Sequence, residues 1–209
     1  MVRIVLALSL ALVLAACAVS SAFDASPERV KEAAYVPDGP PRLTLFTVVS
    51  NTSGSVGHTA LMVSGSQQVI FDPAGSFKHV DIPKRGDVLY GATPAWVAAY
   101  KSAHARTSHH VVSQEITVTP EQAERALALV TSNGAVPAAF CTRSTSAILR
   151  QVPGFEDVQI TFYPEKLMAQ IAQRADVKTE RTFENDAGDV ADGIRAPNAD
   201  VTRAASVTP

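Results

Sequence analysis

The chain has 209 residues, a formal net charge of −2 at pH 7 and 46% hydrophobic residues. It carries no basic stripe and no series of aromatic residues, which argues against nucleic acid as a partner. The sequence has no internal repeat, no phosphate-binding glycine loop and no cysteine-pair metal motif, so neither a cofactor nor a metal ion is expected.

Residues 1–22 are predicted to be a targeting segment outside the fold. Arg3 gives a positive start, and the apolar stretch Ile4–Leu14 is short for a permanent membrane span. Small residues precede Cys17, which favours lipoprotein cleavage before Cys17 and acylation at that residue. An ordinary signal cleavage after Ala22 is the alternative, but it leaves Cys17 without a role.

Ala18, directly after Cys17, resembles the bacterial sorting signal for the outer membrane. We therefore expect a lipid-anchored protein of the cell envelope, in the outer membrane and facing the periplasm.

Three further segments follow from composition. Residues 23–42 contain four prolines and are predicted to be a tether. Residues 43–176 form one domain, and residues 177–209 are predicted to be a disordered acidic tail.

The first half of the domain shows a strand pattern. Rich in β-branched and aromatic residues, three stretches are expected to be strands: Leu43–Val49, His58–Val63 and Gln68–Phe71. The second stretch is apolar on both faces and is therefore expected to lie centrally in a sheet. A tight turn between the second and third strands would place His58 beside Asp72, since those ends of an antiparallel pair lie next to each other.

The second half of the domain alternates between helix and strand signals. Thr119 precedes a proline and lies three residues before Gln122, a pattern typical of a capped helix start, and Asn133-Gly134 ends that helix. The other expected elements are a helix at Pro94–Tyr100, a strand at His110–Val118, a helix beginning at Cys141, a short strand at Ile160–Phe162 and a helix beginning at Pro164. The fold class is α+β, with a small, mainly antiparallel sheet and helices packed against it.

Cys141 is the single free thiol if Cys17 is acylated. An unpaired thiol in an exported protein is a hazard unless it is buried or useful. Cys141 is predicted to open a helix, where the helix dipole lowers the pKa of a thiol. It shares one helical stripe with Thr145 and Ile148, so the thiol is expected to face the sheet.

A catalytic triad follows from this placement. His58 would further lower the pKa of the Cys141 thiol, provided that the helix packs against the His58 strand. Asp72 would accept a hydrogen bond from the other imidazole nitrogen and fix the ring. The backbone N–H of Cys141, free at the helix start, would be one oxyanion donor.

Structural roles account for the same residues. Cys141 could equally be a small buried residue of the core, and His58 a hydrogen-bonded core residue. Asp72 could be a turn residue whose side chain bonds its own backbone. Three other histidines compete for the role of base: His79, His109 and His110. Ser144 and Thr145 are weaker candidates for the nucleophile, because they lie inside the helix. A metal site built from Cys141, His58 and His109 is a further alternative, although no two of these ligands are closely spaced.

The segment His-Thr-Ala-Leu-Met-Val at 58–63, with Asp72 on the next strand and Cys141 opening a helix, resembles the permuted NlpC-type, papain-like cysteine peptidases and amidases. Their lecithin–retinol acyltransferase-like branch includes bacterial lipoproteins. The resemblance covers about residues 43–170 and implies His58 as base, Cys141 as nucleophile and Asp72 in the third, polar position. This sequence departs from the family pattern at one point. In the family, a strand with Gly-Asp usually precedes the histidine, whereas the corresponding segment here, Arg85–Tyr90, follows His58.

The expected function is therefore that of a thiol hydrolase of the envelope, which cleaves amide (peptide) or ester bonds through a thioester on Cys141. Cell-wall peptides are the first candidate substrates, and lipid amides or esters, or transfer to another acceptor, are alternatives within the same chemistry. A non-catalytic, membrane-tethered lipoprotein that uses the fold as a binding or scaffolding module is the competing function. It predicts an ordinary or suppressed reactivity of Cys141 and tolerance of His58→Ala.

Overall fold

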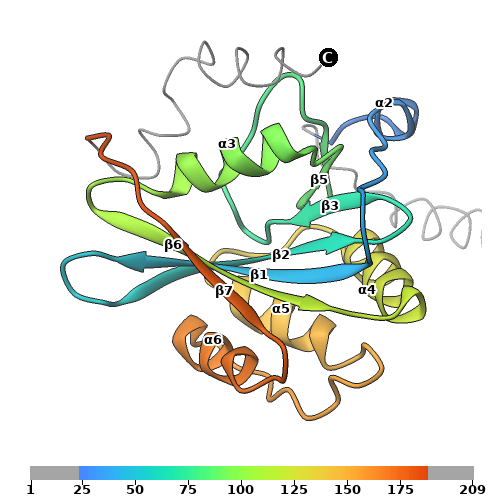
Figure 1. The fold of residues 1–209 in the computed structure, drawn as a ribbon. Coiled ribbons are helices and arrows are strands. Elements are labelled where there is room, and N and C mark those ends of the chain that lie inside the picture. Colours follow the sequence, from blue (N-terminus) through green and yellow to red (C-terminus); the bar gives the residue numbers. More distant parts are fainter. Residues whose placement is uncertain (1–23, 188–209) are drawn as a thin grey trace, which may run out of the picture.

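The computed structural model describes residues 24–187 (Figure 1). Its elements are, in chain order, α2 (Pro27–Glu32), β1 (Arg42–Ser50), β2 (Val56–Ser64), β3 (Gln68–Phe71), β4 (Lys84–Arg85), β5 (Val88–Tyr90), α3 (Pro94–His104), β6 (His109–Thr117), α4 (Pro120–Ser132), α5 (Cys141–Leu149), α6 (Pro164–Ala172) and β7 (Lys178–Thr182). Among the described residues, none of the helices combines the length and the apolar character needed to cross a bilayer.

The strands form a single seven-stranded sheet in the order β4-β5-β3-β2-β1-β6-β7, and every pair of neighbours is antiparallel. The predicted α+β class and antiparallel sheet are therefore confirmed. The predicted central place of the second strand is confirmed as well, because β2 lies between β1 and β3. The turn between β2 and β3 is tight, with Ser64 opposite Gln68.

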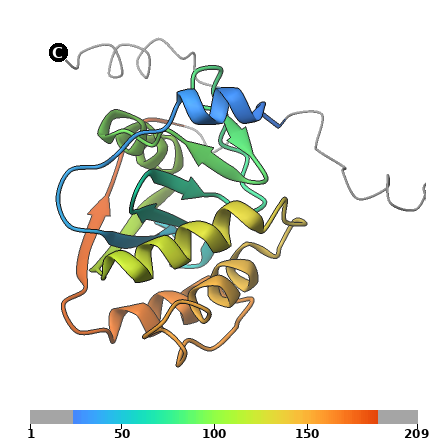
Figure 2. The same cartoon turned by 90° about the vertical axis from the view of Figure 1, so that its right-hand side faces the viewer.

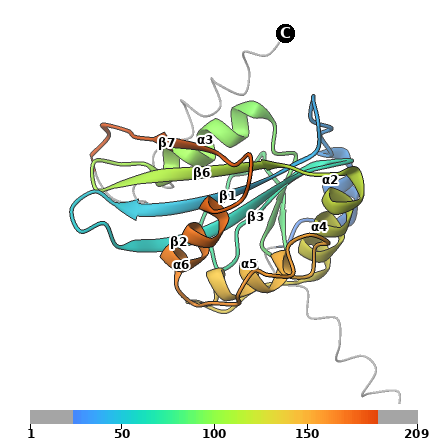
Figure 3. The ribbon, with the colours of Figure 1, turned by 60° about the horizontal axis from the view of Figure 1, so that its bottom comes forward.

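Helices cover both faces of the sheet. Figures 1 and 3 show α3 on one face and α5 and α6 on the other, and Figure 2 shows α4 beside them. Since side chains alternate along a strand, β2 contributes to a separate apolar core on each face. Ala60 and Met62 pack in the core on the α3 side, whereas Leu61 and Val63 pack in the core formed with α4, α5 and α6.

The helix starts agree with their sequence signals. Thr119 and Gln122 form the predicted capping box at the start of α4, which ends just before Asn133. Cys141 is the first residue of α5, as predicted, and the stripe that it shares with Thr145 and Ile148 is buried. The hydrophobic stripe therefore holds α5 against the sheet with the Cys141 thiol inside.

The predicted tether does not hold for residues 24–41. Ser26 caps α2, and Pro27 occupies its first turn, so this short helix has its own start signal. The backbone of Ala25 bonds the carbonyl of Lys84, and the backbone of Gln68 bonds the carbonyl of Tyr35. This segment is thus attached to the sheet by backbone hydrogen bonds. Residues 1–23, with the predicted targeting segment and Cys17, lie outside the described residues.

The predicted disordered tail does not hold for its first part either. β7 pairs with β6 from Lys178 opposite Glu115 to Thr182 opposite Val111. Ion pairs also fix this segment, with 3.3 Å between Lys101 Nζ and Glu180 Oε2. A strand forms without an apolar pattern here because β7 is a largely exposed edge strand, held through its backbone. Residues 188–209 of that predicted tail lie outside the described residues.

Two smaller expectations also change. Residues 160–162 form no strand, since Ile160 and Phe162 are exposed in the connection between α5 and α6, away from the sheet. The expected strand at 85–90 is instead a hairpin, in which β4 and β5 flank Gly86 and Asp87. Both turn residues have positive φ angles, 55° and 63°, as a two-residue hairpin turn of type I′ requires.

Candidate active site

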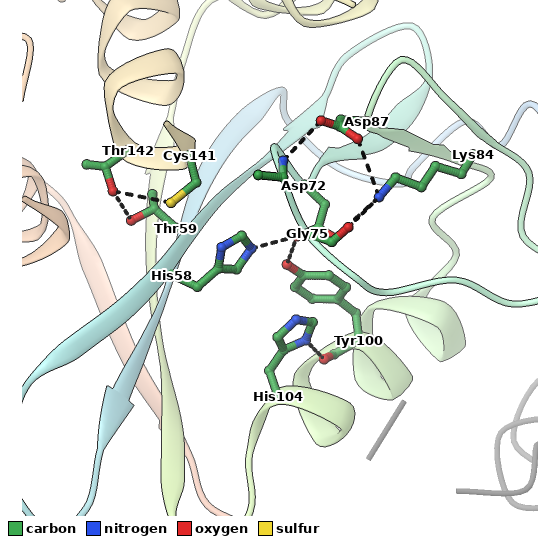
Figure 4. Close-up of polar contacts among 11 residues, drawn as sticks. His58, Thr59, Asp72, Gly75, Lys84, Asp87, Tyr100, His104, Cys141 and Thr142 are labelled. Atoms are coloured by element: carbon green, nitrogen blue, oxygen red, sulfur yellow. Dashed lines mark hydrogen bonds and ion pairs between the residues drawn. The ribbon is translucent and has the colours of Figure 1, made fainter. Parts of the chain in front are cut away.

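A step in the sheet lies beside His58. Pairing between β2 and β3 ends at Leu61 and Phe71, whereas β2 itself begins at Val56. The first residues of β2 therefore have β1 as a neighbour on one side and no strand on the other. At this step, groups from the two faces of the sheet reach one another, with α5 on one side and α3 on the other (Figure 4).

His58 and Asp72 form the predicted pair. His58 Nε2 lies 2.7 Å from Asp72 Oδ1, and the Asp72 side chain is fully buried. Asp72 follows directly after the end of β3, which is why the tight turn brings it back to His58. With Nε2 engaged by the carboxylate, Nδ1 is the ring nitrogen that remains for Cys141.

Three contacts hold Asp72 in place, two at its carboxylate and one at its backbone. The Tyr100 hydroxyl donates to Oδ1 at 2.7 Å, and Lys84 Nζ lies 4.0 Å from Oδ2. The backbone N–H of Asp72 donates to the carbonyl of Asp87 at 2.8 Å. A Cβ on Gly75 would lie 1.9 Å from Asp72 Oδ2, so this position has room for glycine alone. The carboxylate is therefore held in one orientation toward His58.

Cys141 lies at the start of α5 with 8% of its surface exposed. No side chain caps this helix, so its first backbone N–H groups stay available to a ligand. The Thr142 hydroxyl donates to Thr59 Oγ1 at 3.2 Å, which ties α5 to β2. Figure 4 shows the His58 ring between the Cys141 sulfur and Asp72. The structure thus brings together all three residues of the predicted triad.

The charges of the triad stabilise one another. Burial alone would disfavour the His58 imidazolium, but hydrogen bonds to Asp72 and Cys141, together with their negative charges, raise the pKa of His58 to about 10. Burial also opposes the thiolate, yet the hydrogen bond and positive charge of His58, with a further hydrogen bond from the Thr59 backbone, lower the pKa of Cys141 to about 7. The favoured state near neutral pH is a thiolate–imidazolium pair.

Asp72 stays ionised despite its complete burial. Burial raises the pKa of a carboxyl group, but the hydrogen bond and charge of His58, and the charges of His104 and Lys84, hold the pKa of Asp72 well below its usual range. The negative charge of Asp72 is therefore present at neutral pH, where His58 is protonated.

A second imidazole lies next to His58. The rings of His58 and His104 stack with 5.9 Å between their centroids, and His104 Nδ1 lies 2.7 Å from the Tyr100 carbonyl oxygen. Burial, aided by the charge of His58, lowers the pKa of His104 to about 4, although Asp72 acts in the opposite direction. At neutral pH, His104 is thus uncharged while His58 is charged.

A cavity of about 230 Å³ adjoins the imidazoles. It is lined by Val48, Gly57, His58, Ala74, Gly75, Ser76, His104 and His109. Phe140, the residue directly before α5, is exposed, and its ring meets that of Phe162 edge-on with 5.2 Å between the centroids. Ile160 and Tyr163 are exposed as well.

The competing histidines lie elsewhere or have other partners. His79 packs on Trp96, and its ring centroid lies 4.7 Å from that of the indole. His110 Nδ1 lies 2.7 Å from Asn51 Oδ1. His109 lines the cavity but contacts the Ser108 hydroxyl at 2.9 Å. None of these three shows a contact with Cys141 among the described residues.

The alternative nucleophiles are poorly placed. Ser144 is half-buried, and its Oγ lies 3.5 Å from Oδ1 of Asn133, the residue that follows α4. Thr145 is fully buried. Among the other polar residues, Ser76 lines the cavity, whereas Tyr90 lies buried in β5.

Sequence reasoning missed Tyr100, His104 and Lys84. Tyr100 and His104 lie four residues apart in α3, so a single helix face presents both to the site. That spacing was visible in the sequence, but only the fold shows that this face meets Asp72.

The comparisons with known proteins give no match: no family model, no curated protein and no solved structure is similar to this chain.

Proposed function

We propose that this protein is a cysteine-dependent hydrolase of the bacterial cell envelope, which cleaves amide or ester bonds through a thioester on Cys141. One observation carries the proposal: His58 lies between a helix-opening Cys141 and a buried Asp72, which is the arrangement of a thiol triad. The opposite pKa shifts of His58 and Cys141 support it.

In the acylation half, the Cys141 thiolate attacks the substrate carbonyl carbon, and the carbonyl oxygen takes up the negative charge. The uncapped N–H groups at the start of α5, that of Cys141 first, would donate to this oxyanion. The tetrahedral intermediate collapses as the carbon–nitrogen or carbon–oxygen bond breaks. The His58 imidazolium gives its proton to the leaving amine or alcohol, and the acyl group remains on sulfur as a thioester.

In the deacylation half, neutral His58 takes a proton from water, and the resulting hydroxide adds to the thioester carbonyl. Collapse of the second intermediate releases the carboxylic acid and restores the thiolate–imidazolium pair. Asp72 stays ionised throughout, holds the ring orientation and stabilises the charge on His58. An alcohol or amine in place of water would turn the same step into acyl transfer.

We further propose the permuted NlpC-type, papain-like architecture for the domain, in the lecithin–retinol acyltransferase-like branch. The chain order supports this, because the histidine strand β2 precedes the cysteine helix α5 and both belong to one antiparallel sheet with its helices. Acylation at Cys17 would hold the enzyme at the outer membrane facing the periplasm. Cell-wall peptides are then the first substrates to test, and lipid amides or esters the second.

The test is a search for the acyl-enzyme. Purified protein is mixed with activated esters, cell-wall peptides and lipid amides, and the mass of the Cys141 peptide is followed with turnover. We expect an acyl adduct on Cys141 that neutral hydroxylamine removes, as it removes thioesters. The Cys141→Ala variant, with folding checked by circular dichroism, should show neither adduct nor turnover. Unchanged turnover in that variant would contradict the proposal, and a lack of any adduct or turnover would favour the non-catalytic binding module.

A further inference from the structure

Three potential metal ligands meet beside the cavity. His58, Asp72 and His104 each offer one ligand atom, and these atoms all lie within 4.8 Å of one another. The group differs from the metal site considered from the sequence, since it contains His104 and Asp72 in place of His109 and Cys141. Two imidazoles and one carboxylate are a common ligand set for divalent transition metals.

His104 has the tautomer that a metal ligand requires. Its Nδ1 lies 2.7 Å from the Tyr100 carbonyl oxygen, which accepts and therefore fixes the proton on that nitrogen. Nε2 then carries the free lone pair. Metal-binding histidines usually donate their other N–H to a carbonyl or carboxylate in this way, which sets the orientation of the ring. The side chain is also 2% exposed, so its position is fixed by packing.

Asp72 has a free carboxylate oxygen. Oδ1 accepts from His58 and Tyr100, but Oδ2 is buried and has no hydrogen-bond partner. Lys84 Nζ forms an ion pair with Oδ2 but, at 4.0 Å, is too far away to donate a hydrogen bond. A buried charged oxygen without a hydrogen bond is costly, because its lost hydration is not fully replaced. A metal ion bound directly to Oδ2 would supply the close contact that the Lys84 ammonium does not.

We propose that His58, Asp72 and His104 form a binding site for one divalent transition-metal ion, with Zn²⁺ as the best match to two nitrogen ligands and one oxygen ligand. Zinc binds these ligands at about 2 Å, so the three side chains close in on the ion and the His58–Asp72 hydrogen bond opens. The adjoining cavity, lined by His58 and His104, leaves room for water as a fourth ligand. Mg²⁺ and Ca²⁺ prefer oxygen ligands and fit this set poorly.

The site would regulate the enzyme, and this part of the inference rests on the proposed function. A metal-bound His58 holds no proton, so it can neither stabilise the Cys141 thiolate nor protonate a leaving group. Zn²⁺ would thus inhibit turnover reversibly, and EDTA would restore it. While the metal is bound, the Cys141 thiol therefore lacks its activating partner, His58.

Binding is tested without reference to activity. Full-length protein freed of metal with EDTA is titrated with Zn²⁺, and separately with Mg²⁺, by calorimetry. Nitrogen NMR of the histidine rings then shows which of them bind the metal. We expect one Zn²⁺ per chain, changed ring signals for His58 and His104, unchanged signals for His110, and no Mg²⁺ binding. Changes confined to other histidines, or equal binding of Mg²⁺, would overturn the site.

Variants test the ligand set. Loss of a residue that only hydrogen-bonds a metal ligand weakens metal binding by roughly 10-fold, so loss of the ligand itself in His104→Gln should weaken Zn²⁺ binding by at least that factor. His110→Gln is the matched control and should bind Zn²⁺ with wild-type affinity. Cys141→Ala should still bind Zn²⁺, whereas loss of binding in that variant would show that the thiol is a ligand and contradict the proposed set. If His104→Gln does not fold, the NMR titration of the unsubstituted protein still shows whether His58 and His104 bind the metal.

Failure of this inference and failure of the hydrolase are separable. Turnover without Zn²⁺ binding would remove the metal site and leave the enzyme. Zn²⁺ binding at His58 and His104 without turnover in EDTA would leave the metal site and remove the enzyme. Turnover that is insensitive to saturating Zn²⁺ would contradict the regulatory part.

Discussion

His58 Nε2 and Asp72 Oδ1 lie 2.7 Å apart because a tight hairpin turn returns the chain to its starting edge within 14 residues. The carboxylate is fully buried, so its charge acts strongly on the imidazole. This contact leaves Nδ1 for Cys141 and keeps the ring protonated. The reactivity of Cys141 therefore depends on Asp72, which does not touch the thiol.

Asp72→Asn removes this charge while keeping the size of the side chain. The pKa of His58 should fall from about 10, and that of Cys141 should rise above about 7, because the imidazolium loses its largest source of stabilisation. Turnover should fall, but less than in His58→Ala, since Asp72 orients the ring and transfers no proton. Rate measurements across pH in EDTA compare the two variants. An equal loss in both, with folding intact, would indicate a more direct role for Asp72.

Tyr100→Phe removes one donor to the Asp72 carboxylate and keeps the ring that packs against Phe46 and Phe77. Hydrogen bonds to charged groups contribute about 1.5–3 kcal/mol, so the free energy of unfolding should fall by about that amount. Urea denaturation measures it. Tyr90→Phe is the control and should cost less, because the hydroxyl of this buried tyrosine makes no hydrogen bond with the part of the chain that the structure describes. Equal costs would show that the Tyr100 hydroxyl does not support Asp72.

Gly75→Ala tests the space around the carboxylate. The new Cβ would lie 1.9 Å from Asp72 Oδ2, so the Asp72 side chain or the loop must move. Turnover and the rate of Cys141 alkylation at neutral pH should both drop. Gly57→Ala is the matched control, because a Cβ there meets nothing within 4 Å. A normal Cys141 alkylation rate in Gly75→Ala would mean that the position of Asp72 is not critical.

Truncation before Lys178 removes β7 and leaves β6 as the edge of the sheet. The ion pairs of Lys101 with Glu180 and of Arg106 with Asp186 are lost as well. The midpoint of thermal unfolding should therefore fall. Truncation after Ala187, which keeps β7, separates this effect from the loss of residues 188–209. Equal unfolding midpoints for both truncations would show that β7 adds nothing to stability.

Elements with a strong local signal could be predicted from the sequence. The proline and capping residues before α4 and the runs of apolar, β-branched and aromatic residues in β1, β2 and β3 locate these elements in the chain. β7 could not be predicted, because it buries no apolar face and forms through backbone pairing with a strand that precedes it by more than 60 positions in the chain. The N-cap of α2 at Ser26 could have been recognised in the sequence, but the prolines around it favoured the prediction of a tether.

The candidate site could likewise be predicted only in part. His58, Asp72 and Cys141 each lie at the end of an element, so patterns of strands and helices were sufficient to suggest that they meet. Tyr100 and His104 act from the interior of α3, where tyrosine and histidine look like ordinary buried residues. Their contact with Asp72 depends on which face of α3 meets the sheet, and the sequence alone does not determine that.

The most direct test of the triad is the pH dependence of Cys141 alkylation in the metal-free protein, with and without His58→Ala, followed by mass spectrometry of the Cys141 peptide. We predict a thiolate that forms with a pKa of about 7, and a higher pKa once His58 is removed, because burial then opposes the thiolate without the charge and hydrogen bond of the imidazolium. A Cys141 pKa that is near 8.5 or higher in the wild type and unchanged by His58→Ala would contradict the thiol hydrolase.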